Sequence, residues 1–206
     1  MLFRSGPGRA GPGRAGPGRA EPGRAGAGGA DRLPLLIAGP DLAHAGTEVA
    51  QIARVYPGCR PLSGAQATVS AALGGLDGAR LAHLAAHGHH DRENFLFSRL
   101  ELADGPLMAY DIQRLAAAPH QVVLSACDVG RTVVRPGEEV LGFTSALLYA
   151  GSATVISSVA RVADETAVGV MTGYHRALAG GTGPASALAE AVGGEPFSPF
   201  VCFGAG

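Results

Sequence analysis

The sequence predicts a mixed α/β fold in which helices cover both faces of a mainly parallel sheet. Short apolar runs alternate along the chain with segments of helical spacing. This alternation is typical of parallel sheets, because each parallel connection needs a crossover, which is usually a helix. No apolar run approaches the roughly 18 residues that a membrane-spanning helix requires, so we expect no membrane segment.

Four apolar runs are expected to be the core strands, and each is bounded by a change in composition. The run at 33–38 is closed by Gly39-Pro40, and the run at 80–86 ends at His87-Gly88. The other two core strands are expected at 121–126 and 153–159. An edge strand or hairpin is expected around 97–102, and a closing strand at 199–203.

The segments between the strands carry helical spacing. The first, 47–56, has Val49, Ile52 and Ala53 on one stripe and stops before Pro57-Gly58. A long helix at 165–178 ends in Gly180-Gly181, where glycine favours a helix terminus. The remaining helices are expected at 68–76, 109–116, 138–150 and 184–192.

Residues 1–30 differ from the rest of the chain. They repeat the unit Pro-Gly-Arg-Ala and offer nothing to fill a core, so we expect a disordered Arg/Gly/Pro-rich tail ahead of a domain at 31–206. The tail holds five Arg and one acid, whereas the remainder holds 11 Arg and 16 acids. A mildly acidic domain does not predict a nucleic-acid partner, which requires clustered basic residues.

The three cysteines are odd in number and widely spaced, which favours a reducing, cytoplasmic setting over a disulfide framework. Cys127 ends the strand at 121–126 and precedes a polar turn, so its sulfur is expected to face a cleft. It would need a basic neighbour, since a thiol with a pKa of about 8.5 is mostly protonated at neutral pH. Cys59 and Cys202 are expected to be structural.

The segment His83-Leu-Ala-Ala-His-Gly-His-His90 offers that basic neighbour. His87 ends a strand and has the right side chain for a general base, and the backbone N–H of Gly88 could donate to an oxyanion. His83 is expected to line the sheet on the same face, with His89 and His90 in an exposed loop. A metal site is not expected, because His83 and His87 would lie about 13 Å apart on a strand.

From Val69 to Phe203 the chain resembles the CHAT domain, a caspase/separase-related module of the clan CD-like cysteine peptidases. Several short stretches, taken in order, carry the resemblance: His83-Leu-Ala-Ala-His87-Gly88, Asn94–Ser98, Leu102–Leu107, Tyr110–Ile112, Val122-Val-Leu-Ser-Ala-Cys127, Arg135–Gly142, Ala150–Ala153, Asp164–Thr166 and Pro199–Val201. Where the family often has a Trp-Pro pair and two acids, this chain has a single Asp164 followed by Glu165.

The resemblance implies a caspase-like three-layer sandwich and a regulated cysteine endopeptidase without a cofactor. His87 would be the general base, Cys127 the nucleophile, and the N–H groups of Gly88 and Cys127 the oxyanion hole. Asp128 and Asp164 would bind the substrate, although a turn and a helix cap explain them equally well.

We expect a protein or peptide substrate, a role in bacterial signalling or defence, and a sensor or activator partner such as a tetratricopeptide-repeat module. A catalytically silent CHAT interaction module remains the alternative. The sequence alone does not separate it from the peptidase.

Overall fold

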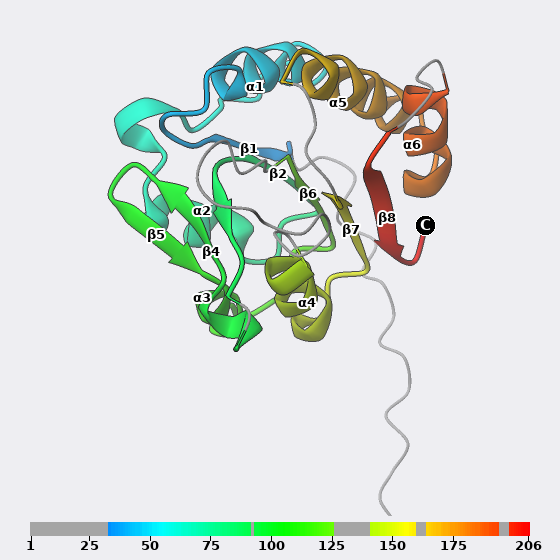
Figure 1. Cartoon of the computed structure of the whole chain (residues 1–206). Coiled ribbons are helices and arrows are strands. Elements are labelled where there is room, and N and C mark those ends of the chain that lie inside the picture. Colours follow the sequence, from blue (N-terminus) through cyan, green and yellow to red (C-terminus); the bar gives the residue numbers. More distant parts are fainter. Residues whose placement is uncertain (1–32, 92, 126–140, 160–163, 194–197) are drawn as a thin grey trace, which may run out of the picture. The chain divides into compact units, whose positions relative to one another are not determined.

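A computed structural model describes residues 33–91, 93–125, 141–159, 164–193 and 198–206 (Figure 1). The predicted tail at 1–30 and the segment 126–140, which contains Cys127 and Asp128, lie outside these described residues.

A five-stranded sheet forms the centre of the fold and confirms the predicted mixed α/β class with a mainly parallel sheet. Its strand order is β1-β2-β6-β7-β8. The first four strands run parallel and β8 runs antiparallel to β7. The strands are β1 (Leu35–Ala38), β2 (Leu81–Ala85), β6 (Gln121–Leu124), β7 (Thr154–Ser158) and β8 (Phe200–Gly204).

Successive residues of the central strands face two separate cores. Val122 and Val123 in β6 are both fully buried, yet Val122 packs in one apolar cluster and Val123 in the other. A strand buried on both faces reads as a continuous apolar run, because its side chains point alternately up and down. The runs that predicted the strands therefore reflect a covered sheet.

Helices form the two outer layers (Figure 1). One face of the sheet is covered by α1 (Ala45–Ala53), α5 (Asp164–Ala179) and α6 (Pro184–Val192), and the other by α2 (Val69–Leu76), α3 (Ala109–Ile112) and α4 (Leu141–Ala150). Local signals fix several boundaries. The Thr68 side chain accepts a hydrogen bond from Ala71 N and caps α2, and Pro184 opens α6.

The predicted helix at 109–116 is shorter in the structure, where α3 ends at Ile112. The backbone beyond it bonds to the turn between α2 and β2. Gly78 N donates to the carbonyl of Ala117 at 2.8 Å, and Ala117 N donates to Asp77 Oδ1 at 2.8 Å. These long-range bonds hold the segment after Ile112 in a turn.

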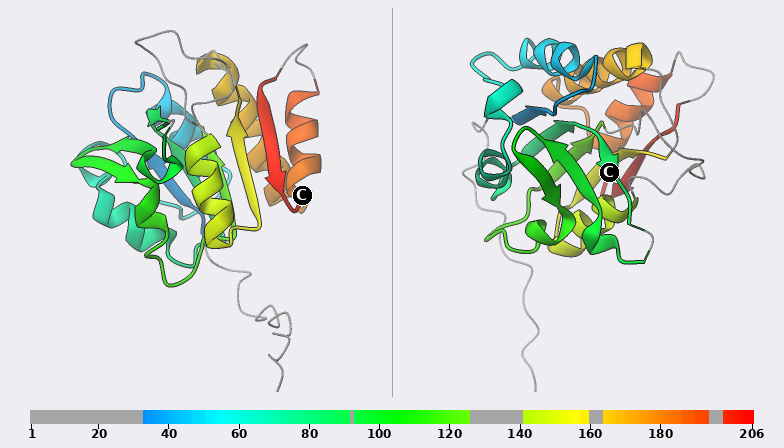
Figure 2. Two further views of the ribbon diagram at one scale, coloured as in Figure 1. Left: turned by 60° about the horizontal axis from the view of Figure 1, so that its bottom comes forward. Right: turned by 60° about the vertical axis from the view of Figure 1, so that its left-hand side comes forward.

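A small antiparallel sheet follows β2 and forms the green hairpin region of Figure 2. It comprises β3 (Gly88–His89), β4 (Arg99–Leu102) and β5 (Gly105–Met108), with a short 3-10 turn at Phe95–Phe97 between β3 and β4. Another 3-10 turn, at Gly64–Gln66, lies earlier in the chain, between α1 and α2. The hairpin expected around 97–102 is confirmed. The loop expected for His89 and His90 is wrong for His89, which lies in β3. His90 follows β3 outside any strand, but it is half-buried and its ring bonds to the buried Ser98.

Candidate functional site

The carboxyl ends of β1 and β2 approach each other closely, and His87 lies just beyond them. Gly39 N donates to the carbonyl of Ala85 at 2.7 Å. A Cβ atom added to Gly39 would lie 2.7 Å from Ala86 Cβ and 2.8 Å from the carbonyl oxygen of Glu101. A residue with a side chain would push these segments apart, so glycine permits the close approach.

His87 is half-buried and contacts the loop that follows β1. Its Nε2 lies 3.1 Å from the backbone carbonyl oxygen of Asp41. A carbonyl oxygen can only accept, so in a neutral ring this contact places the hydrogen on Nε2 and the lone pair on Nδ1. The Asp41 backbone has φ +58°, in the left-handed region that Asp tolerates better than most residues.

Gly88 pairs with Leu100 of β4, and the ladder geometry sets the direction of its N–H. Glu101 N donates to the carbonyl of His87 at 2.8 Å, which makes Gly88 and Leu100 a pair without mutual hydrogen bonds. The Gly88 N–H therefore points away from β4.

The end of β6 lies beside the end of β2. Leu84 pairs with Leu124, and Ser125 N donates to the carbonyl of Leu84 at 3.0 Å. Cys127 and Asp128 follow Ser125 in sequence, but both lie outside the described residues. Asp164 is the first residue of α5, and its side chain also lies outside the described part of the chain.

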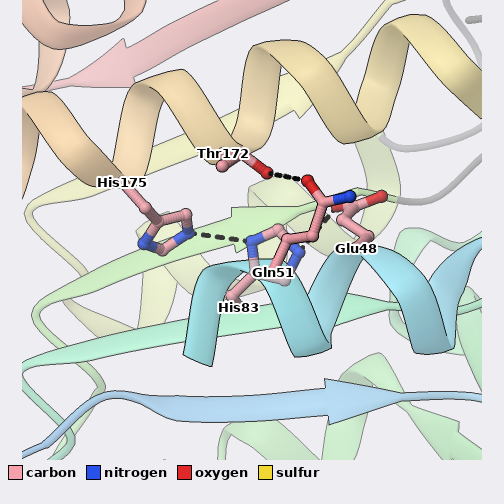
Figure 3. A network of polar contacts seen from close by, with 5 residues as sticks. All are labelled: Glu48, Gln51, His83, Thr172 and His175. Carbon is pink, nitrogen blue, oxygen red and sulfur yellow. Dashed lines mark hydrogen bonds and ion pairs between the residues drawn. The ribbon is translucent and has the colours of Figure 1, made fainter. Parts of the chain in front are cut away.

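His83, which we expected to line the sheet, is fully buried and joins a polar network that sequence analysis missed (Figure 3). His83 Nε2 lies 2.8 Å from Glu48 Oε1 on α1, and its Nδ1 lies 3.1 Å from His175 Nε2 on α5. His175 Nδ1 lies 3.0 Å from the Tyr56 hydroxyl. Glu48 within an otherwise apolar helix stripe was the one available signal.

The surroundings of two members of this network, His175 and Tyr56, keep those side chains uncharged. Burial and the neighbouring His83 hold the pKa of His175 well below its usual range. Burial, with a smaller effect of Cys59, raises the pKa of Tyr56 to about 12. Both shifts favour the neutral side chains.

Cys59 and Cys202 are free thiols with half-buried side chains. Cys59 Sγ donates to the carbonyl of Pro34 at 3.2 Å, and Cys202 lies in β8. Burial raises the pKa of both thiols, which makes them poor nucleophiles. This agrees with the structural role expected for them.

Neither a metal site nor a membrane span is found among the described residues. They contain no group of three or more His, Cys, Asp or Glu side chains placed to hold a metal ion. None of the helices within the described ranges has the length and apolar character needed to cross a membrane.

The described residues form the three-layer sandwich with a mainly parallel sheet that characterises caspase-like folds. The family model of the CHAT domain matches residues 20–194, and this chain therefore belongs to the CHAT domain family, which is related to the caspase-like cysteine peptidases. The matched range begins inside the segment predicted to be a tail. A search of curated proteins finds no match.

Proposed function

We propose that this CHAT-family chain is a regulated cysteine endopeptidase with His87 as general base and Cys127 as nucleophile. The observation that carries the proposal is the setting of His87. It stands at the carboxyl end of β2, held through Nε2 by the Asp41 carbonyl, beside the end of β6. Functional groups of parallel α/β sheets gather at this edge.

Covalent geometry supports the pairing of the two residues. The backbone N–H of Ser125 donates a hydrogen bond to the carbonyl of Leu84 in β2, and Cys127 comes two residues after Ser125 in the sequence. Two residues of extended chain span at most about 7 Å, and this short connection supports a position for Cys127 near the edge that carries His87.

The proposed reaction is acyl transfer through a thioester. His87 Nδ1 accepts the thiol proton, and the thiolate of Cys127 attacks the carbonyl carbon of the scissile peptide bond. The N–H groups of Gly88 and Cys127 stabilise the oxyanion. His87 then gives the proton to the leaving amine, and a water that it activates hydrolyses the thioester and frees the thiol.

Substrate binding and control belong to the same proposal. Asp128 and Asp164 follow the ends of β6 and β7 in the chain, where carboxylates could bind a basic or polar side chain of a protein or peptide substrate. We place the protein in the cytoplasm, where its thiols stay reduced, under the control of a sensor or activator protein.

Cleavage of a diverse peptide library tests the activity. We expect Cys127→Ala to abolish cleavage and His87→Ala to lower kcat/KM by about 100-fold or more, because a general base contributes at least that much. Cys59→Ala and Cys202→Ala are the matched controls and should retain activity. Cleavage that persists in Cys127→Ala would exclude this cysteine as the nucleophile.

Thiol labelling tests the site without a substrate or an activator. A thiol-reactive probe should modify Cys127 faster than Cys59 and Cys202, whose pKa values burial raises. His87→Ala should remove that preference. Equal labelling of the three cysteines in the wild type would instead favour a catalytically silent interaction module.

A further inference from the structure

Four polar side chains form one continuous chain of contacts beneath the edge that carries His87. Glu48 on α1, His83 on β2 and His175 on α5 are buried, and Tyr56, just after α1, is half-buried (Figure 3 shows the first three). The successive contacts measure 2.8 Å, 3.1 Å and 3.0 Å from Glu48 to Tyr56. The chain therefore runs from a buried carboxylate toward the surface.

The carboxylate sets the direction of every hydrogen bond when both imidazoles are neutral. A carboxylate only accepts, so His83 must donate from Nε2 and accept at Nδ1. His175 then donates from Nε2 to His83, and its Nδ1 accepts from the Tyr56 hydroxyl. Each neutral ring donates once and accepts once.

A second arrangement satisfies the hydrogen bonds of the same four side chains after the network has taken up one proton. The Tyr56 hydroxyl also lies 3.3 Å from the backbone carbonyl oxygen of His175, an alternative acceptor. Tyr56 passes its proton to His175 Nδ1 and takes another from solvent, while His175 passes its Nε2 proton to His83 Nδ1. His83 ends as a cation beside Glu48, and His175 stays neutral with its hydrogen on Nδ1.

The surrounding elements do not compete for this proton. Burial raises the pKa of Tyr174, Cys59 and Cys202, so these groups stay neutral and hold their own protons. Gln51 and Thr172, which hydrogen-bond to each other beside the chain, do not titrate. Other ionisable side chains on the packed helices and the segments beside α1 include the exposed Arg54, Glu165, Arg176 and Glu190, and His44, which is half-buried just before α1.

We propose that Glu48, His83, His175 and Tyr56 form a pH-sensitive switch that takes up one proton and reverses the hydrogen bonds of His175. The switch joins the elements that flank the candidate site. His83 precedes His87 by four residues, and α1 begins four residues after Asp41. It changes the charge between α1 and β2, and it requires no peptidase activity.

Histidine ring NMR on the full chain tests the proposal, because ¹⁵N shifts distinguish the two neutral tautomers from the cation. Between about pH 8 and pH 5, the range in which histidine titrates, His83 should become cationic while His175 stays neutral. In the same step His175 should change from the Nε2–H to the Nδ1–H tautomer. A His175 ring that keeps Nε2–H throughout, or becomes cationic together with His83, would overturn the proposal.

Two variants and one control separate the switch from simple packing. Tyr56→Phe retains the edge-to-face ring contact with His175 but removes the hydroxyl. Glu48→Gln removes the anion. Each variant should lower the pH midpoint of proton uptake by about one unit or more, so that proton uptake needs a proton concentration about tenfold higher. Tyr56→Phe alone carries the test if Glu48→Gln does not fold.

Thr172→Val is the matched control. It breaks the hydrogen bond between Gln51 and Thr172, which joins the same two helices, α1 and α5, without a titratable group. This variant should lose some stability and keep the wild-type midpoint. A midpoint shift in Thr172→Val as large as that in Tyr56→Phe would show that helix packing, and not the relay, sets the titration.

Discussion

At the scale of single residues, His175 illustrates how burial links stability to pH. Its side chain is fully buried, and its pKa lies well below the ordinary value of 6.5 because of burial and the neighbouring His83. The unfolded chain therefore binds a proton at this residue below about pH 6.5, whereas folded His175 does not. Stability falls as pH falls through this range, because the unfolded state binds more protons.

We expect His175 to cost on the order of 1 kcal/mol of unfolding free energy between about pH 7.5 and pH 5.5. Denaturant titrations of the wild type and of His175→Gln at the two pH values measure this contribution. The variant should be less stable at the higher pH, where it loses buried contacts, and should lose less stability on acidification. Equal losses in both proteins would contradict the assignment.

In the proposed mechanism, His87 depends on a backbone atom for the orientation of its ring. The contact from Nε2 to the Asp41 carbonyl, at 3.1 Å, selects the tautomer with the lone pair on Nδ1. Asp41 supplies this acceptor from its backbone, so its side chain takes no part in the contact. At this scale the candidate site depends on main-chain geometry as much as on residue type.

At the scale of elements, the segment after β1 packs tightly against the segment after β2, next to His87. Gly39 packs against Ala86 and the carbonyl of Glu101 with no space for a Cβ atom. The atoms that it meets include backbone, which cannot move aside as a flexible side chain can. The position of the Asp41 carbonyl thus depends on a glycine two residues earlier.

Gly39→Ala should lower the unfolding free energy by about 1–3 kcal/mol, the usual cost of overpacking. It should also weaken His87-dependent thiol labelling, because the loop that orients His87 must move. Denaturant unfolding and the labelling assay measure the two effects. Gly46→Ala in α1, where an added Cβ meets nothing within 4 Å, is the matched control. It should leave labelling unchanged and stabilise the helix by up to about 1 kcal/mol.

At the scale of the whole domain, two apolar cores share one sheet. Leu76 of α2 lies in the core on one face and Met171 of α5 in the core on the other, and both are fully buried. The strands between them belong to both cores. Loss of either core therefore removes support from the same sheet.

Leu76→Ala and Met171→Ala should each cost about 2–5 kcal/mol, because each leaves a cavity. Both variants should still unfold in a single transition, with fluorescence and circular dichroism changing together. Two separate transitions in either variant would show that the layers fold independently. Tyr149→Phe, at an exposed position, is the control and should change the unfolding midpoint little.

Several features of this protein follow from the sequence alone. The strand positions, the covered parallel sheet, α6 at 184–192 and the placement of His87-Gly88 at a strand end are all predicted by short-range patterns. These features depend on side-chain alternation and on glycine and proline at the ends of elements. Both signals are local, because they can be read from residues that are close together in the sequence. The CHAT resemblance is confirmed by the family match.

The remaining features depend on how the helices pack over the sheet. The Asp41 carbonyl that contacts His87 belongs to the backbone, so the residue type at position 41 does not predict this contact. Glu48 and His83 are 35 residues apart, and His83 and His175 are 92 residues apart. Their contacts depend on how α1 and α5 pack over β2, and local periodicity does not encode that packing. The sequence therefore determined where the chemistry-bearing residues stand along the strands, and packing decided which of them meet.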